Sequence, residues 1–127
     1  ISIKSIAQDT AKVKLKEYLG VLTLTEKYRD EKNWGVAEQA IVSEHFQRLV
    51  KLKNEGVIVL AGRTNYETNN PEMMWLVIFY ANDDAAALEF MLNDPAVKNK
   101  IMNAIIDPIK IVQIDIIMYS NSVCWNH

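Results

Sequence analysis

Residues 73–81 read MMWLVIFYA, and this run decides the fold because it is apolar at every position. A strand with one solvated face alternates apolar and polar side chains, whereas a strand covered on both faces is apolar throughout. We therefore predict a strand here, either at the centre of a sheet or with its second face covered by a partner subunit. The preceding residues 63–72, RTNYETNNPE, contain Asn69, Asn70 and Pro71 and predict a hairpin loop.

A strand, a long helix and a second strand are predicted before this hairpin. The first strand is YLGVLTLT at 18–25, and the polar loop KYRDEKN at 27–33 follows it. The stretch 34–56, WGVAEQAIVSEHFQRLVKLKNEG, predicts a helix with Asn33 as its N-cap and Gly56 as a left-handed C-terminal cap. The short β-branched run VIVLAG at 57–62 then predicts the second strand.

A second helix and a last strand are predicted after residue 81. The helix is DDAAALEFMLND, capped by Asn82 or Asp83 and closed by Pro95. Residues 96–107 are expected to form a short helical or irregular connection. The final strand is then IKIVQIDIIMY at 109–119, directly after Pro108.

The order β-α-β-β-α-β predicts a ferredoxin-like α+β fold, a four-stranded antiparallel sheet with two helices on one face. We divide the chain into an N-terminal extension (1–17), one domain (18–119) and a polar C-terminal tail (120–127). The other face of the sheet has no helix of its own and is too apolar to meet water. We therefore expect the chain to form a homodimer in which the sheet of a second copy covers this face.

Composition bounds the function without defining it. The chain has 127 residues, 50% of them hydrophobic, and Lys+Arg 14 against Asp+Glu 16 gives a net charge of -2. This predicts one soluble domain without a nucleic-acid surface, and no apolar run reaches the roughly 18 residues of a membrane helix. Cys124 is the only cysteine, so no internal disulfide forms. The sequence begins at Ile1 rather than Met, so cytoplasm is only the default compartment and an exported form is the alternative.

His45 is the residue most able to carry chemistry. At about 100° per residue from Ile41, His45 falls at about 40°, between Leu52 at about 20° and Leu49 at about 80°. The imidazole therefore points into the apolar face of the long helix, where each ring nitrogen needs a partner. The other histidine, His127, is the last residue and is expected to be inert.

Two interpretations of His45 follow from its position alone. It is either a core histidine bonded to a backbone carbonyl, or a proton-transfer group beside a buried carboxylate. The candidate carboxylates are Asp94 before Pro95, Asp107 before Pro108, and Asp115 within an isoleucine-rich run. Each of them alone is more often structural than catalytic.

An ordered set of motifs in this chain resembles the YCII-related family. The matching pieces are Glu44-His45 on the first helix, Gly56 with Ala61-Gly62 around the second strand, and Asp94-Pro95 after the second helix. The resemblance spans residues 18 to 118. It implies a ferredoxin-like domain that forms dimers related to the dimeric α/β barrels. The family includes a dehydrochlorinase of a chlorinated hydroxyhydroquinone, and its fold is similar to that of muconolactone isomerases.

The resemblance also implies site residues. The proposed catalytic His-Asp pair of the family falls on His45 and Asp94 of this chain. Where family members often have Gly-Pro after the second strand, this chain has Gly62-Arg63. We assign both residues to substrate binding, with Arg63 either holding an anionic substrate through its planar guanidinium or lying on the rim.

The expected function is therefore acid/base chemistry without a cofactor, of dehydrochlorinase, lyase or isomerase type, on a phenolic or enolic small molecule. A non-catalytic dimer that binds a small molecule, or an accessory subunit, is the alternative. The sequence has no usual metal-ligand spacing, no GxSxG, no GxGxxG and no P-loop, so metal, triad and nucleotide chemistry are not expected.

Overall fold

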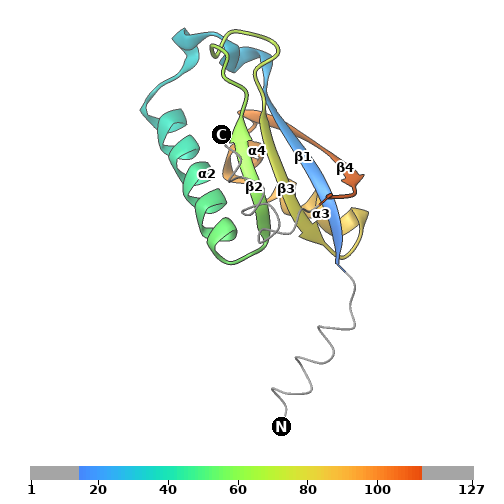
Figure 1. Cartoon of the computed structure of the whole chain (residues 1–127). Coiled ribbons are helices and arrows are strands. Elements are labelled where there is room, and N and C mark those ends of the chain that lie inside the picture. The colour runs from blue at the N-terminus through green and yellow to red at the C-terminus, as the bar shows by residue number, and fades with distance from the viewer. Residues whose placement is uncertain (1–14, 113–127) are drawn as a thin grey trace, which may run out of the picture.

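The computed structural model of the chain describes residues 15–112 (Figure 1). Its elements, in chain order, are β1 (Lys16–Leu24), the 3-10 helices η1 (Glu26–Arg29) and η2 (Glu31–Asn33), α2 (Val36–Asn54), β2 (Ile58–Arg63), β3 (Trp75–Ala81), α3 (Asp84–Leu92), α4 (Pro95–Lys98) and β4 (Met102–Ile109). The β-α-β-β-α-β order is confirmed, with α4 as a short addition. The fold is ferredoxin-like.

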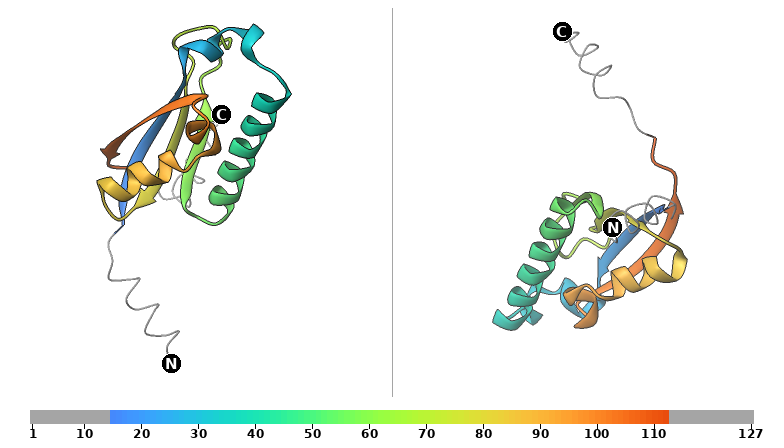
Figure 2. Two further views of the ribbon diagram at one scale, coloured as in Figure 1. Left: turned by 180° about the vertical axis from the view of Figure 1, so that it is seen from behind. Right: turned by 90° about the horizontal axis from the view of Figure 1, so that it is seen from below.

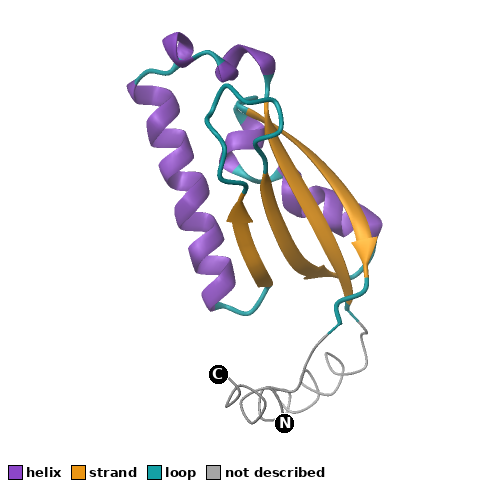
Figure 3. Cartoon of the chain, turned by 45° about the horizontal axis from the view of Figure 1, so that its top comes forward, coloured by secondary structure: helices purple, strands orange, loops and turns teal. Residues whose placement is uncertain are grey.

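The four strands form one antiparallel sheet in the order β2-β3-β1-β4. The apolar run at 73–81 thus supplies a central strand, as predicted. Helix α2 runs alongside β2, and α3 lies behind β1 and β3 in the view of Figure 1. The reverse view in Figure 2 brings α3 and α4 in front of the sheet. Colouring by element type shows the same separation of helices from sheet (Figure 3).

The core lies between this sheet and the helices. Alternate side chains of β1 are buried, beginning with Tyr18, whose ring stacks on Phe79 with 5.9 Å between centroids. Phe79 stacks in turn on Phe90 of α3 at 4.2 Å. A Cβ at Gly20 would lie 2.5 Å from the sulfur of Met91, so the missing side chain at Gly20 makes room for the end of the Met91 side chain of α3.

The middle of the opposite face of the sheet is apolar, as predicted, while Asp107 and Asn103 of β4 lie on the same face. Leu19 lies beside Ile78 there, and Val21 lies between Leu76 and Ile105. Ile105 is 59% exposed and Leu76 is 36% exposed. No helix among residues 15–112 covers these side chains. In the same range, no helix is both long and apolar enough to cross a membrane.

Helix α2 begins later than predicted. Asn33 was expected to be its N-cap, but the Asn33 side chain donates to Lys27 O at 2.8 Å within the turns of η1 and η2. The cap is Gly35, whose N–H donates to the Glu38 carboxylate at 2.9 Å. This is one half of a capping box, with the acid three residues into the helix. The C-terminal prediction is confirmed, because Gly56 has φ 83°.

The last strand was predicted too late in the sequence. β4 spans Met102–Ile109, so most of it lies within the stretch 96–107 that was expected to be a connection. Pro108 does not precede this strand but lies inside it, opposite Tyr18. β4 is an edge strand, where the missing N–H of a proline is tolerated. Residues 110–112 form no strand, and 113–119 lie outside the described residues, as do 1–14 and the tail 120–127.

The second helix is shorter than its predicted range. Asp83 caps α3 by accepting the Ala86 N–H at 2.8 Å, as one of the two predicted caps. The helix ends at Leu92, and Pro95 does not close it. Pro95 instead begins α4, where the missing N–H of a first-turn proline costs nothing.

The hydrogen bond between Tyr18 and Asp84 predicts a loss of stability at high pH. The Tyr18 hydroxyl donates to Asp84 at 2.6 Å, which raises the pKa of Tyr18 to about 12, with burial acting in the same direction. An unfolded tyrosine ionises near pH 10, so this contribution is complete below about pH 10 and is lost as the pH rises towards 12. Urea unfolding should therefore show a smaller alkaline loss in Tyr18→Phe than in wild type. Equal pH slopes in the two proteins would contradict this.

Candidate active site

His45 lies where the helical wheel placed it. The side chain is 2% exposed and belongs to the buried face of α2, together with Leu49. Phe46, the next residue along the helix, is 64% exposed although its side chain is apolar. The buried side chains of α2 therefore form a narrower stripe than the number of apolar residues in the helix indicates.

Asp94 reaches His45 from the connection between α3 and α4. It is the N-cap of α4, and its Oδ1 accepts the Ala96 N–H at 2.9 Å. The Asp-Pro pair thus starts α4 and directs the carboxylate into the protein, where it is 1% exposed. His45 Nδ1 lies 2.7 Å from Oδ2 and 2.9 Å from Oδ1. The structure brings together the two residues that the resemblance paired.

Arg48 is a third member of this cluster. Its Nη1 donates to Asp94 Oδ2 at 3.3 Å, and its Nη2 donates to the Phe90 carbonyl at 2.7 Å. The guanidinium also lies over the Phe90 ring, 4.7 Å from the centroid. Arg48 therefore ties α2 to the end of α3 and gives the buried carboxylate a cationic partner in addition to the imidazole.

The electrostatics of the cluster keep Asp94 ionised. Burial alone would raise the pKa of Asp94, but the hydrogen bond and charge of His45, the Ala96 N–H and Arg48 together lower it. Burial lowers the pKa of Arg48, and Asp94 opposes that effect. An ionised carboxylate can only accept hydrogen bonds, so the proton between the two residues belongs to His45 Nδ1.

The tautomer leaves His45 Nε2 for a ligand. In the neutral ring, Nε2 then carries the lone pair. Nε2 is buried, and within residues 15–112 it has no hydrogen-bond partner. An unpartnered buried polar atom costs about 1–3 kcal/mol, so this nitrogen is the unsatisfied atom of the site.

A cavity of about 350 Å³ adjoins His45 between α2 and β2. This volume is within the range of small-molecule sites. The walls are mostly apolar, and the indole of Trp75 meets the His45 ring edge-on at 6.0 Å. The lining residues are Val42, His45, Phe46, Leu49, Val50, Lys53, Asn54, Leu60, Ala61, Gly62, Arg63 and Trp75.

Only some of the other candidate residues named from the sequence lie at the cavity. Gly62 and Arg63 both line the cavity. Arg63 is exposed, donates from Nη2 to Tyr66 O at 2.7 Å, and lies 5.8 Å from the Trp75 centroid. Asp107 is exposed on β4 opposite Leu19 and does not line the cavity. Asp115, Cys124 and His127 lie outside the described residues.

Fold and site together define a small ferredoxin-like α+β domain with a buried His-Asp pair at the wall of an apolar cavity. The family model of the YCII-related domain matches residues 19–110, which is most of the chain. The protein belongs to the YCII-related family. No curated protein matches it significantly.

Sequence reasoning missed Arg48 and Trp75 as parts of the site. Arg48 follows His45 by three residues, and side chains at that spacing are neighbours on a helix surface. That spacing was the available signal for Arg48. Trp75 could be placed only after the register of β2 with β3 was known, because Arg63 pairs with it there.

The lowered pKa of Asp94 predicts a loss of stability in acid. A carboxylate with a lowered pKa contributes stability that is complete above the unfolded value of about 3.9 and is lost as the pH falls below it. Asp94→Asn should cost about 1–3 kcal/mol at neutral pH and flatten the acid limb of urea-unfolding stability. Asp107→Asn, which changes an exposed carboxylate, is the matched control. Identical acid limbs in the two variants would refute the assignment.

Proposed function

We propose that this protein is a small-molecule enzyme in which His45 and Asp94 perform acid/base chemistry without a cofactor. One observation carries the proposal: His45 Nε2 is buried and unpartnered while Nδ1 is held by an ionised carboxylate. A general base needs this arrangement, with a fixed tautomer and a free lone pair. The adjoining apolar cavity supports a small organic substrate.

The proposed substrates are phenols or enols, and the reactions are dehydrochlorination or a double-bond shift. In dehydrochlorination, Nε2 takes the hydroxyl proton from a chlorinated keto tautomer. The O–H electron pair forms a carbonyl, the double bonds shift, and the C–Cl pair leaves with chloride. In isomerisation, Nε2 takes a proton from the carbon next to a carbonyl and returns it at the far end of the resulting dienolate. In both reactions Asp94 holds the ring and stabilises the imidazolium.

Gly62 and Arg63 are proposed to bind the substrate. Arg63 and His45 contact the same indole, so the guanidinium stands near the reacting end of the cavity. A cation there favours the phenolate or enolate that proton transfer creates. Gly62 pairs with Leu76, so a Cβ at Gly62 would point to the bare face of the sheet, and it is the Gly62 backbone that would meet the substrate.

The proposed enzyme is a homodimer in which a second copy covers the bare face of the sheet, as in the dimeric α/β barrels. The exposure of Ile105 and Leu76 supports this cover, because apolar patches of this kind mark interfaces. Ile105→Lys should shift sedimentation from dimer to monomer. Val112→Lys, which changes a residue beyond the end of β4 that is 89% exposed, should not. A wild-type monomer at micromolar concentration would reject the homodimer.

Turnover of chlorinated hydroquinones and enol lactones tests the enzyme proposal, with chloride release and ultraviolet absorbance as readouts. His45→Gln should lower the rate about 10²–10⁴-fold when measured at a temperature where the variant stays folded, and its melting temperature should also fall because Asp94 loses the imidazole donor. Asp94→Asn should lower it as well. Gln47→Ala, on the exposed side of the same helix, is the control and should keep the full rate.

A second substitution separates catalysis from binding. Ala61→Leu should raise KM more than it lowers kcat, because Ala61 pairs with the core residue Val77 and the added side chain would reduce the room for substrate in the cavity. If the wild type binds these compounds without converting them, the alternative of a binding dimer or accessory subunit replaces the enzyme. The apolar lining favours that alternative equally well.

A further inference from the structure

Two rows of α2 side chains form one wall of the cavity. His45, Leu49 and Lys53 make the first row, and Phe46, Val50 and Asn54 make the second. Residues four apart share a helix face, so each row runs along the helix axis. Eight residues at 1.5 Å each separate His45 from Lys53 by about 12 Å. The cavity is therefore elongated, with the reacting nitrogen toward one end.

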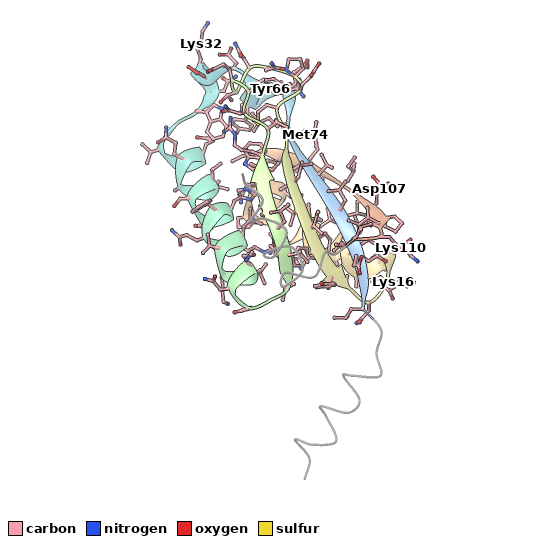
Figure 4. All side chains as sticks on the ribbon, in the orientation of Figure 1. Lys16, Lys32, Tyr66, Met74, Asp107 and Lys110 are labelled. Atoms are coloured by element: carbon pink, nitrogen blue, oxygen red, sulfur yellow. The ribbon has the colours of Figure 1, made fainter. Side chains whose placement is uncertain are left out.

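The residues of β2 and β3 that line the cavity also indicate which of its ends lies near His45. Arg63 donates to the Tyr66 carbonyl, and Figure 4 shows Tyr66 at the end of the molecule where α2 begins. Trp75 lies between Arg63 and His45, within 6.0 Å of each. Arg63 thus belongs to the His45 half of the cavity, while Lys53 and Asn54 belong to the last turn of α2.

The polarity of the lining changes along this length. The middle is apolar on both walls, with Leu49 and Val50 on α2 and Leu60 and Ala61 on β2. Lys53 and Asn54 stand beyond this section, and both are exposed. The lining residues include two cations, Lys53 and Arg63, and no carboxylate. An ammonium and an amide at the far end can both donate hydrogen bonds to an anion.

We propose that the substrate is an elongated organic acid whose carboxylate binds Lys53 and Asn54, about 12 Å along the helix from the group that reacts at His45. An apolar chain or ring joins the two ends and fills the middle of the cavity. Arg63 serves the reacting end and Lys53 the remote end. This inference rests on the proposed function, because it takes His45 as the reacting end.

Calorimetric titration of the full chain tests the inference without requiring turnover. The probes are para-hydroxyphenyl acids of increasing length, from para-hydroxybenzoate to para-hydroxyphenylpentanoate, and the amide of the longest acid. Affinity should rise with length, and the longest acid should bind about fivefold more tightly than its amide. Lys53→Gln should abolish the difference between acid and amide. Lys51→Gln, whose lysine pairs with Glu55 and does not line the cavity, should preserve it.

Several results would overturn the inference: equal binding of acid and amide, no dependence on length, no binding at all, or equal effects of Lys53→Gln and Lys51→Gln. The proposed function fails in a different experiment. If His45→Gln kept full turnover while length and charge selection persisted, the acid site would stand and His45 would lose its role. If turnover depended on His45 but selection was absent, only the remote carboxylate site would be lost.

Discussion

The contact between His45 and Asp94 is the interaction on which the rest of the structure depends. It joins the long helix α2 to the start of α4 through two side chains that are 2% and 1% exposed. Taking a carboxylate out of water costs several kcal/mol unless it is fully bonded. Here the imidazole, the Arg48 guanidinium and the Ala96 N–H all donate to it. The carboxylate is tolerated because three donors replace its water.

Asp94 serves the fold and the site with the same two oxygens. By capping α4, it sets where the chain turns from α3 toward β4. By accepting from Nδ1, it fixes the His45 tautomer and leaves Nε2 unpartnered. Stability and the proposed proton transfer are therefore coupled at this residue. His45 differs, because its Nε2 makes no stabilising contact within the described residues and remains available for chemistry.

Local patterns in the sequence predicted much of the fold and one half of the site. The apolar run at 73–81 indicated a central strand, Gly56 indicated a left-handed cap, and the helical wheel buried His45. Each of these features depends on neighbours within a few residues. The predicted bounds of the last strand were wrong because Pro108 was taken as the residue that precedes it. The edge position that tolerates this proline exists only in the assembled sheet.

The pairing of His45 with Asp94 was beyond any local pattern. The two residues are 49 positions apart, and Asp94, Asp107 and Asp115 were comparable candidates by composition. Only the family resemblance selected Asp94. Arg48 was missed although its spacing from His45 was visible, because an arginine on a helix is usually assigned to solvent. Its burial depends on Phe90, whose ring and carbonyl both contact the guanidinium.

The arrangement of charges explains how an apolar cavity could support proton transfer. In the proposed reaction, moving a proton from a neutral substrate to His45 creates an imidazolium and an anion beside mostly apolar walls, which solvate charge poorly. Asp94 already stands behind the imidazole as an ionised group, and Arg63 stands beside Trp75 on the substrate side. The new charges would therefore form between opposite charges that are in place before the reaction. Arg48 also bonds to Asp94, so the cluster of Arg48, Asp94 and a neutral His45 has no net charge. Because Arg48 offsets part of the Asp94 charge, Asp94 stabilises the imidazolium less strongly, and the proton is easier to return.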